Sequence, residues 1–317
     1  MIRKLMLILM VLLLASCQSK DIKVKQYYIA VIPKTGTSNF YRDVKAGVDS
    51  AASEHGVRVT FDGSLNEEDW EMQNFYLEKA IDAKADAIVI SPIDSSKSSE
   101  LLKKAIKNGI TVVTMDSKVD IDKIYGYVGT DNYQSGKMMA QHLKETYTEK
   151  ISVGIVDFND QSDSTLKRRQ GFIEELSKYD NTKIESIIKT SSNVSDTSDL
   201  TKKMIQDNPS INTIVTFSEN TTMGVGYAIR DLSKQDDIMV FGYDNNERII
   251  GMIESCEIDK IIVQNSFAIG YMAIETAING IESKGKKQDD IFTDILIVDL
   301  DNLYEYNNQK FVFSFYN

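Results

Sequence analysis

The sequence predicts an α/β protein with two lobes, each built around a doubly wound parallel sheet. Short apolar runs alternate with longer segments of helical periodicity along most of the chain. About ten such runs occur, more than the five or six strands of an average sheet, so two sheets are expected. Proline is scarce, with three residues in all, and no low-complexity linker divides the chain. The lobes are therefore expected to lie in close contact, with several crossings between them.

The apolar runs are rich in isoleucine and valine and lack polar alternation. This pattern is typical of strands that are covered on both faces. The predicted strands are 28–32, 57–61, 87–90, 110–115, 124–128, 151–156, 184–188, 211–217, 238–241 and 260–263.

Helical patterns fill the segments between these runs. Val44, Val48, Ala51 and His55 fall on one face of a helix, and Gly56 then marks its C-terminal end. A repeated succession of strand, helix and strand indicates parallel βαβ units.

The N-terminus carries the features of a secretory signal. Arg3 and Lys4 precede an uncharged apolar run of eleven residues, 5–15, whereas a membrane-spanning helix needs about 20. Such a short run fits the apolar core of a signal peptide. The run ends in Leu14-Ala15-Ser16-Cys17, which resembles a bacterial lipobox and implies that Cys17 is lipidated. Residues 1–16 are thus predicted to be a signal peptide and 17–23 a lipid-anchored tether; an ordinary signal with an incidental cysteine is the alternative.

Composition disfavours several classes of function. Without residues 1–16 the chain has 34 basic and 47 acidic side chains, a balance of −13, which argues against a nucleic-acid partner because phosphate contacts supply most of such affinity. Two histidines and no closely spaced cysteine pair leave little basis for a metal site or for catalysis. We expect no cofactor and no enzymatic activity. Cys256 is expected to be a buried or partly buried side chain.

Polar residues follow the predicted strands where a ligand site is expected. In open parallel sheets, ligands bind beyond the carboxyl ends of the strands. Carboxylates accept hydroxyl protons, amides both donate and accept, and aromatic faces cover the apolar side of a sugar ring. A single such residue more often caps the next helix, but seven positions together favour a site for a small sugar. The candidates at these positions are Ser38, Phe40, Tyr41, Asp116, Ser117, Asn132, Ser218, Asp244 and Gln264.

Several segments resemble the type I periplasmic sugar-binding proteins, the family that includes the ribose-binding proteins. The segments are Thr37-Ser38-Asn39-Phe40-Tyr41, Val112-Val113-Thr114-Met115-Asp116, Gly129-Thr130-Asp131-Asn132, Arg168-Arg169-Gln170-Gly171-Phe172, Val240-Phe241-Gly242-Tyr243-Asp244 and Gln264. The resemblance implies that Phe40 and Tyr41 stack on or line the sugar ring. It also implies that four residues hydrogen-bond the sugar hydroxyls, namely Asp116, Arg168, Asp244 and Gln264.

The same resemblance implies two lobes that close as a hinge about three crossings. The N-lobe would comprise 24–130 and 265–292, and the C-lobe 131–264 and 293–317. A membrane permease of an ABC importer would recognise the closed form. The chain departs from the family at Ser117, where some members have arginine, and at Ser218-Glu219, where asparagine is usual before the acidic residue. The identity of the sugar, pentose or hexose, therefore stays open.

Three other functions compete with import. The protein could present a sugar, for example a pentose such as xylose, to a membrane histidine kinase. A nucleotide-dependent oxidoreductase is disfavoured. Gly224-Val225-Gly226 matches only the start of the dinucleotide-binding motif G-x-G-x-x-G/A, whose last position is Ile229 here. A sugar-responsive repressor would need a DNA-binding segment where this chain has its signal peptide.

Overall fold

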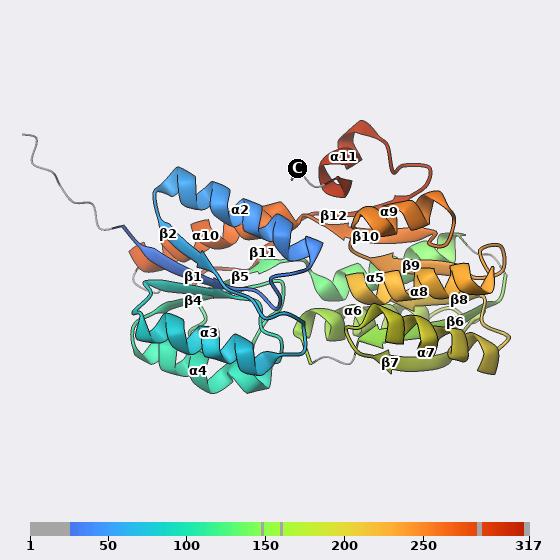
Figure 1. The fold of residues 1–317 in the computed structure, drawn as a ribbon, viewed down its shortest axis with the longest axis horizontal. Helices are drawn as coiled ribbons and strands as arrows, with labels where there is room; N and C mark the ends of the chain where they lie inside the picture. The colour runs from blue at the N-terminus through green and yellow to red at the C-terminus, as the bar shows by residue number, and fades with distance from the viewer. Residues whose placement is uncertain (1–25, 147–148, 159–160, 284–286, 314–317) are drawn as a thin grey trace, which may run out of the picture.

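The structure, a computed structural model, describes residues 26–146, 149–158, 161–283 and 287–313. Cys17, the predicted signal peptide and the predicted tether lie outside the described residues. The described chain forms two lobes side by side (Figure 1), each with a six-stranded sheet.

The N-lobe sheet has the strand order β11-β5-β4-β3-β1-β2, and all of its pairs are parallel. Its strands are β1 (Tyr28–Ile32), β2 (Arg58–Phe61), β3 (Ala87–Ile90), β4 (Thr111–Met115), β5 (Gly126–Gly129) and β11 (Ile291–Phe292). The C-lobe sheet has the order β12-β10-β9-β8-β6-β7. Its strands are β6 (Ile151–Phe158), β7 (Thr182–Thr190), β8 (Thr213–Thr216), β9 (Met239–Tyr243), β10 (Lys260–Gln264) and β12 (Ile295–Asp299).

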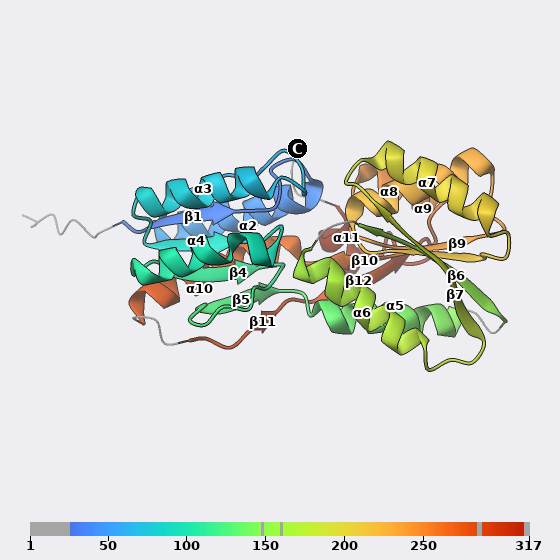
Figure 2. The same cartoon turned by 90° about the horizontal axis from the view of Figure 1, so that it is seen from below.

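Helices cover both faces of each sheet, as Figure 2 shows most clearly for the C-lobe. In the N-lobe, α2 (Asn39–His55) and α10 (Ser266–Glu282) pack on one face, and α3 (Trp70–Asp82) and α4 (Ser95–Lys107) on the other. In the C-lobe, α5 (Asn132–Thr146) and α6 (Asp163–Leu176) cover one face. The opposite face carries α7 (Val194–Asp207), α8 (Glu219–Leu232) and α9 (Glu247–Glu254). A short helix, α11 (Tyr306–Val312), follows β12.

Apolar burial on two faces explains why these runs form strands. Every residue of β3 is buried, with Val89 and Ile90 fully shielded from solvent, and burying one such side chain contributes about 1.5–3 kcal/mol. The first helix ends as predicted: Gly56 adopts φ +64° and caps α2 after His55, a conformation that glycine tolerates best.

Three expectations about the strands need correction. All ten predicted strands are present with ends shifted by at most two residues, but β11 and β12 were not predicted as strands. β12 pairs antiparallel with β10, so the C-lobe sheet is not wholly parallel. The edge strands β2 and β7 are only partly buried, because a sheet edge has a neighbour on one side only.

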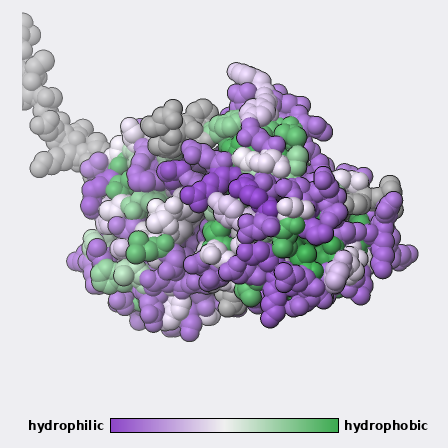
Figure 3. Space-filling model, turned by 45° about the vertical axis from the view of Figure 1, so that its right-hand side comes forward, coloured by the Kyte–Doolittle hydropathy of each residue, from purple (hydrophilic) through white to green (hydrophobic). Residues whose placement is uncertain are grey.

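The expectation for Cys256 is wrong. This thiol is exposed, because Cys256 lies just beyond α9 in a turn with φ +60°. The visible surface in Figure 3 is largely hydrophilic, with smaller and separated hydrophobic patches. No helix among the described residues is both long enough and apolar enough to cross a membrane.

Three connections join the two sheets, namely β5 to α5, β10 to α10 and β11 to β12. They lie beside one another, because Thr293 N–H donates to the carbonyl of Gly129 at 2.9 Å and Asn265 N–H to the carbonyl of Asp294 at 3.3 Å. The expected lobe boundaries remain a prediction.

Candidate ligand-binding site

Two aspartates occupy equivalent turns at the ends of strands in the two lobes. Asp116 directly follows β4 with φ +58°, and Asp244 directly follows β9 with φ +65°. Each amide N–H donates to the neighbouring strand, at Val128 (3.0 Å) and Ile262 (2.8 Å). A non-glycine residue in this conformation is uncommon and persists only where the surrounding structure holds it. The repeated turn brings one carboxylate from each lobe to the same cavity.

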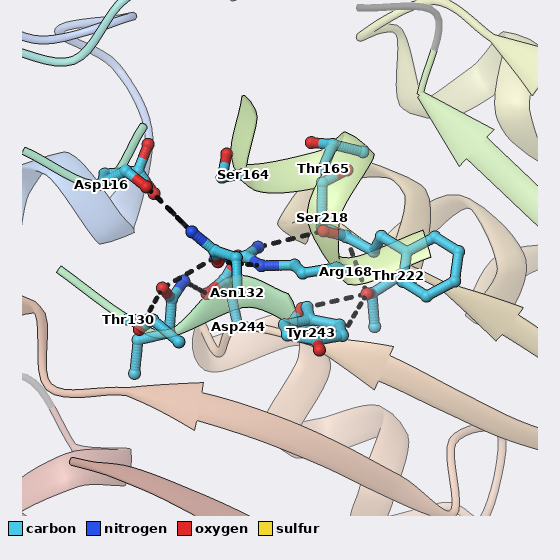
Figure 4. A network of polar contacts seen from close by, with 12 residues as sticks. Asp116, Thr130, Asn132, Ser164, Thr165, Arg168, Ser218, Thr222, Tyr243 and Asp244 are labelled. Carbon is cyan, nitrogen blue, oxygen red and sulfur yellow. Dashed lines mark hydrogen bonds and ion pairs between the residues drawn. The ribbon is translucent and has the colours of Figure 1, made fainter. Parts of the chain in front are cut away.

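Arg168 of α6 lies between these carboxylates (Figure 4), and 3% of it is exposed. Its Nη2 is 3.9 Å from Asp116 Oδ1, and its Nη1 is 3.9 Å from Asp244 Oδ2. The guanidinium also lies over the Tyr243 ring, 4.5 Å from the centroid. Its Nη1 donates to the carbonyl of Phe217 at 3.1 Å. Arg168 is thus a fixed, buried cation that faces both lobes.

Two amides complete this arrangement. Asn132 Oδ1 accepts from Arg168 Nε at 2.8 Å, while its Nδ2 donates to the Asp116 carbonyl at 3.0 Å. Gln264 Oε1 accepts from Arg168 Nη2 and from Thr130 Oγ1, both at 2.8 Å. Gln264 Nε2 donates to Asp244 Oδ1 at 2.6 Å. The amides therefore join Arg168 to both aspartates, and a planar guanidinium is suited to such fixed geometry.

Asp116 is the centre of a second cluster, on the N-lobe side. Its Oδ2 accepts from Tyr41 Oη at 3.0 Å and from Ser91 Oγ at 2.8 Å. Lys34 Nζ lies 2.9 Å from the same oxygen. Lys34 Nζ also donates to Ser164 Oγ of the C-lobe at 2.8 Å, so a buried ammonium links the two lobes.

These surroundings shift the pKa values of the two aspartates in opposite directions. Burial alone would raise the pKa of Asp116, but Lys34, Arg168 and the hydrogen-bond donors outweigh it, and the pKa falls below its ordinary value. Burial raises the pKa of Asp244 above its ordinary value, against the attraction of Arg168 and the hydrogen bond from Gln264. Burial would lower the pKa of Arg168, but Asp244, Tyr243 and Asp116 raise it.

The cavity at this point measures about 30 Å³. It is lined by Lys34, Phe40, Tyr41, Glu67, Asp116, Ser164, Thr165, Arg168, Ser218, Glu219, Asp244 and Gln264. A neighbouring cleft between the lobes measures about 490 Å³ and shares Glu67 and Glu219 with it. Among the described residues, no group of three His, Cys, Asp or Glu side chains is placed to hold a metal ion.

The structure brings most of the predicted residues to this cavity. Phe40 is half-buried and meets Tyr41 edge-on, with centroids 5.0 Å apart, whereas Tyr41 is 2% exposed and its hydroxyl is bonded to Asp116. Ser117 does not line the cavity itself, but its hydroxyl donates at 3.0 Å to Ser164, which does. Ser218 lines the cavity and also begins α8 in a capping box.

Ser38 is placed differently. It caps α2 by accepting from the Tyr41 N–H at 3.2 Å, and it lines the neighbouring cleft rather than the inner cavity.

Sequence reasoning missed Lys34, Ser164 and Glu219. Lysine and glutamate are almost never fully buried unless paired, so sequence alone favours solvent for both. Lys34 does stand directly after Pro33, in the segment that follows β1, where the strand-end rule could have found it. Ser164 lies in the first turn of α6, with no feature that distinguishes it from a helix-start serine.

Comparisons with known proteins agree with this architecture. A family model described as a periplasmic binding protein domain matches residues 29–287. A ribose import binding protein of Bacillus subtilis is 26% identical over 255 residues, which cover 80% of this chain and 81% of that protein. A D-allose-binding periplasmic protein of Escherichia coli is 26% identical over 265 residues, which cover 81% of this chain and 85% of that protein.

A solved structure gives the same result. It is a carbohydrate transporter solute-binding protein from Agrobacterium radiobacter in complex with D-arabinose, with a TM-score of 0.86 and 25% sequence identity. The alignment covers 91% of this chain and 99% of that chain. These three relatives are named as binding proteins, and none is named as an enzyme.

Proposed function

Because the chain belongs to the periplasmic binding protein family, we propose that it is an extracytoplasmic solute-binding protein that captures a small sugar between its lobes. The single observation that carries this proposal is the buried Arg168, which faces a strand-end carboxylate from each lobe at 3.9 Å. As expected, the chain is a binding protein and not an enzyme.

Unused hydrogen-bonding capacity favours a polyol as the ligand. Asp116 Oδ1 and Asp244 Oδ2 face Arg168 at 3.9 Å, beyond hydrogen-bond distance. Each ionised carboxylate oxygen can accept about two hydrogen bonds and donate none. A ligand rich in hydroxyl groups supplies the missing donors, and its charge-assisted bonds in a buried site are strong.

Phe40 supplies the aromatic contact in this proposal. Its ring is the more accessible of the adjacent pair, because the Tyr41 ring is buried and its hydroxyl is committed to Asp116 and Ser91. The C–H face of a sugar ring can pack on Phe40. Tyr41 then acts by positioning Asp116, while Ser117 and Ser218 border the ring.

Binding requires the lobes to part. Small-molecule sites measure about 300–1,000 Å³, whereas the inner cavity measures about 30 Å³. We propose that the lobes, 24–130 with 265–292 and 131–264 with 293–317, rotate about the three crossings to admit the sugar. Closure then buries the ligand among Asp116, Arg168, Asp244, Asn132 and Gln264.

The names of the relatives support a destination for the sugar. The B. subtilis relative is named for ribose import, so we propose that an ABC permease receives the sugar from this protein. We also propose that Cys17 anchors the chain to the membrane through a lipid. Mass spectrometry of the mature N-terminus tests the anchor; an unmodified Cys17 would contradict it.

Thermal unfolding of the purified protein against pentoses, hexoses and polyols tests the proposed function. A ligand at about 100 times its Kd adds roughly 2.7 kcal/mol, so one or a few sugars are expected to raise Tm clearly. Asp244→Asn should abolish that rise. Asp237→Asn, an exposed aspartate paired with Lys234 outside the site, should leave it intact. A flat response of the wild-type protein to every sugar would overturn the proposal.

A further inference from the structure

Glu219 is a buried carboxylate with one unsatisfied oxygen. It begins α8, and 8% of the residue is exposed. Its Oε1 accepts from Asn246 Nδ2 at 2.8 Å and from Asn39 Nδ2 at 3.3 Å. Its Oε2 is buried without a hydrogen-bond partner among the described residues.

Such an oxygen is costly, because a buried acceptor without a partner loses its hydration and gains nothing in return. Glutamate at a helix start is common, since the helix dipole favours a negative charge there. That explanation does not account for the orientation of Glu219, whose Oε1 accepts hydrogen bonds from two asparagine side chains outside α8. Burial raises the pKa of Glu219 against the hydrogen bond from Asn246, and the nearby charge of Asp244 raises it further.

The position of Glu219 shows what could satisfy it. The side chain borders both the inner cavity, with Asp244 and Phe40, and the neighbouring cleft between the lobes. A ligand held by Asp244 and packed on Phe40 would therefore lie next to Glu219.

We propose that Glu219 is a specificity-determining residue, whose Oε2 accepts a hydrogen bond from one hydroxyl group of the bound sugar. This inference rests on the proposed function and adds a ligand contact to it. Asn246, the nearer donor at 2.8 Å, holds Oε1 and so fixes the direction of Oε2. A sugar that lacks the corresponding hydroxyl group, or carries it in the opposite orientation, would lose that bond. The site would therefore discriminate against such a sugar.

The charges of the cavity narrow the ligand further. Two cations, Lys34 and Arg168, face three carboxylates, Asp116, Asp244 and Glu219, and a fourth acidic side chain also lines the wall. A sugar acid or a sugar phosphate would add negative charge beside an acidic excess. The ligand class is thus a neutral sugar.

Glu219→Gln tests the contact with little change in shape. Asn246 Nδ2 needs an acceptor, so the amide oxygen of the new side chain should keep the place of Oε1. The NH₂ group then replaces Oε2 and presents a donor where an acceptor stood. For the sugar that gives the largest Tm rise with the wild-type protein, calorimetry should show a Kd about 10- to 100-fold weaker. Asn39→Ala is the matched control, because it removes the interlobe bond to Oε1 and leaves Oε2 in place.

Deoxy analogues of that sugar identify the contact itself. With the wild-type protein, the analogue that lacks the contacted hydroxyl should bind about 10- to 100-fold more weakly than the parent sugar. With Glu219→Gln, parent and analogue should bind alike, whereas Asn39→Ala should keep the wild-type discrimination. Circular dichroism checks that each variant is folded, and Glu219→Asp, which withdraws the oxygen by one methylene, replaces the glutamine variant if that one does not fold.

The outcomes separate the two proposals. If the wild-type protein binds no sugar, the proposed function fails, and this inference fails with it. The other outcome is that the wild-type protein binds sugar, but the ratio of Kd values between each deoxy analogue and the parent sugar is the same for the wild-type protein and the Glu219 variant. In that case Glu219 contacts no hydroxyl group, and only the present inference is overturned.

Discussion

At the scale of residues, Asp116 and Asp244 share a backbone turn but differ in electrostatic state. Asp116 accepts from Tyr41 and Ser91 and pairs with Lys34, and its pKa is lowered. Asp244 has Gln264 as its hydrogen-bond donor at Oδ1 and Arg168 at ion-pair distance, and its pKa is raised by burial. The N-lobe aspartate therefore stabilises the fold in its charged form, whereas burial penalises the charge of its C-lobe counterpart.

The asparagine variants of these residues should consequently behave differently without sugar. Asp116→Asn leaves the buried Lys34 ammonium without its carboxylate and should cost about 3 kcal/mol of unfolding free energy at neutral pH. Asp244→Asn removes a charge that the fold disfavours, and should change that free energy by about 1 kcal/mol or less. Denaturant unfolding measures both. Equal losses would contradict the assigned electrostatic states.

Acid should separate these variants further. A lowered pKa means that the charge of Asp116 stabilises the fold above its ordinary pKa, and that this contribution is lost as the pH falls through the folded-state value. The gap between the wild-type protein and Asp116→Asn should narrow in that window. Asp244 should affect stability in the opposite direction. Because its pKa is raised in the folded state, its protonation as the pH falls favours the folded state.

At the scale of elements, both lobes use glycines to bring two helices together. In the N-lobe, a Cβ at Gly47 of α2 would lie 2.0 Å from the carbonyl oxygen of Phe267 in α10. In the C-lobe, a Cβ at Gly136 of α5 would lie 2.0 Å from the carbonyl oxygen of Arg168 in α6. The close approach of α5 and α6 therefore sets the position of the backbone that carries the central cation.

Gly136→Ala should weaken both the fold and the binding. The added methyl group pushes α6 away at Arg168, and overpacking of this kind costs about 1–3 kcal/mol. The same shift should weaken sugar binding measured by calorimetry. Gly251→Ala is the control, because this glycine of α9 has open space at its Cβ and alanine favours a helix by about 0.5–1 kcal/mol. If Gly136→Ala bound sugar as tightly as Gly251→Ala, the positioning role of this contact would be wrong.

At the scale of the whole molecule, direct hydrogen bonds hold the lobes against each other. Ser164 of the C-lobe accepts from Lys34 at 2.8 Å and from Ser117 at 3.0 Å, and both donors belong to the N-lobe side. Asn39 and Glu219 add a further bond across the cleft. In the described arrangement the two lobes thus contact each other through polar side chains, as expected for the closed form that we propose.

Ser164→Ala should shift the sugar-free protein toward an open form. Losing a hydrogen bond from a buried ammonium costs about 1.5–3 kcal/mol, which displaces a two-state equilibrium by about tenfold or more. Small-angle scattering should give a larger radius of gyration than for the wild-type protein, and saturation with sugar should reduce it. Ser177→Ala is the control, because this exposed serine directly follows α6 in the same lobe. It should leave the radius of gyration unchanged. An unchanged radius in Ser164→Ala would show that this bond does not hold the lobes together.

Strand-end reasoning located most of the candidate site because it depends on local pattern. An apolar run ending in Asp116 or Asp244 is readable from the sequence, and parallel sheets place such ends at one edge. The same reasoning missed Lys34, because its burial depends on Asp116 and Ser164, which are 82 and 130 positions away in the chain. Its assignment of Ser38 to the ligand stays a prediction, because that side chain caps α2 and lines the neighbouring cleft.

The sequence by itself determined the two-lobed α/β architecture, the ten main strands and the set of strand-end side chains, because these follow from the period of apolar residues and from local turn chemistry. Tertiary structure alone decided the antiparallel β12, the exposure of Cys256, the opposite pKa shifts of the two aspartates and the unsatisfied oxygen of Glu219. Each of these depends on which groups, distant in the sequence, the fold brings into contact. Burial and these contacts change the energy of a charged side chain far more than the residues next to it in the sequence do.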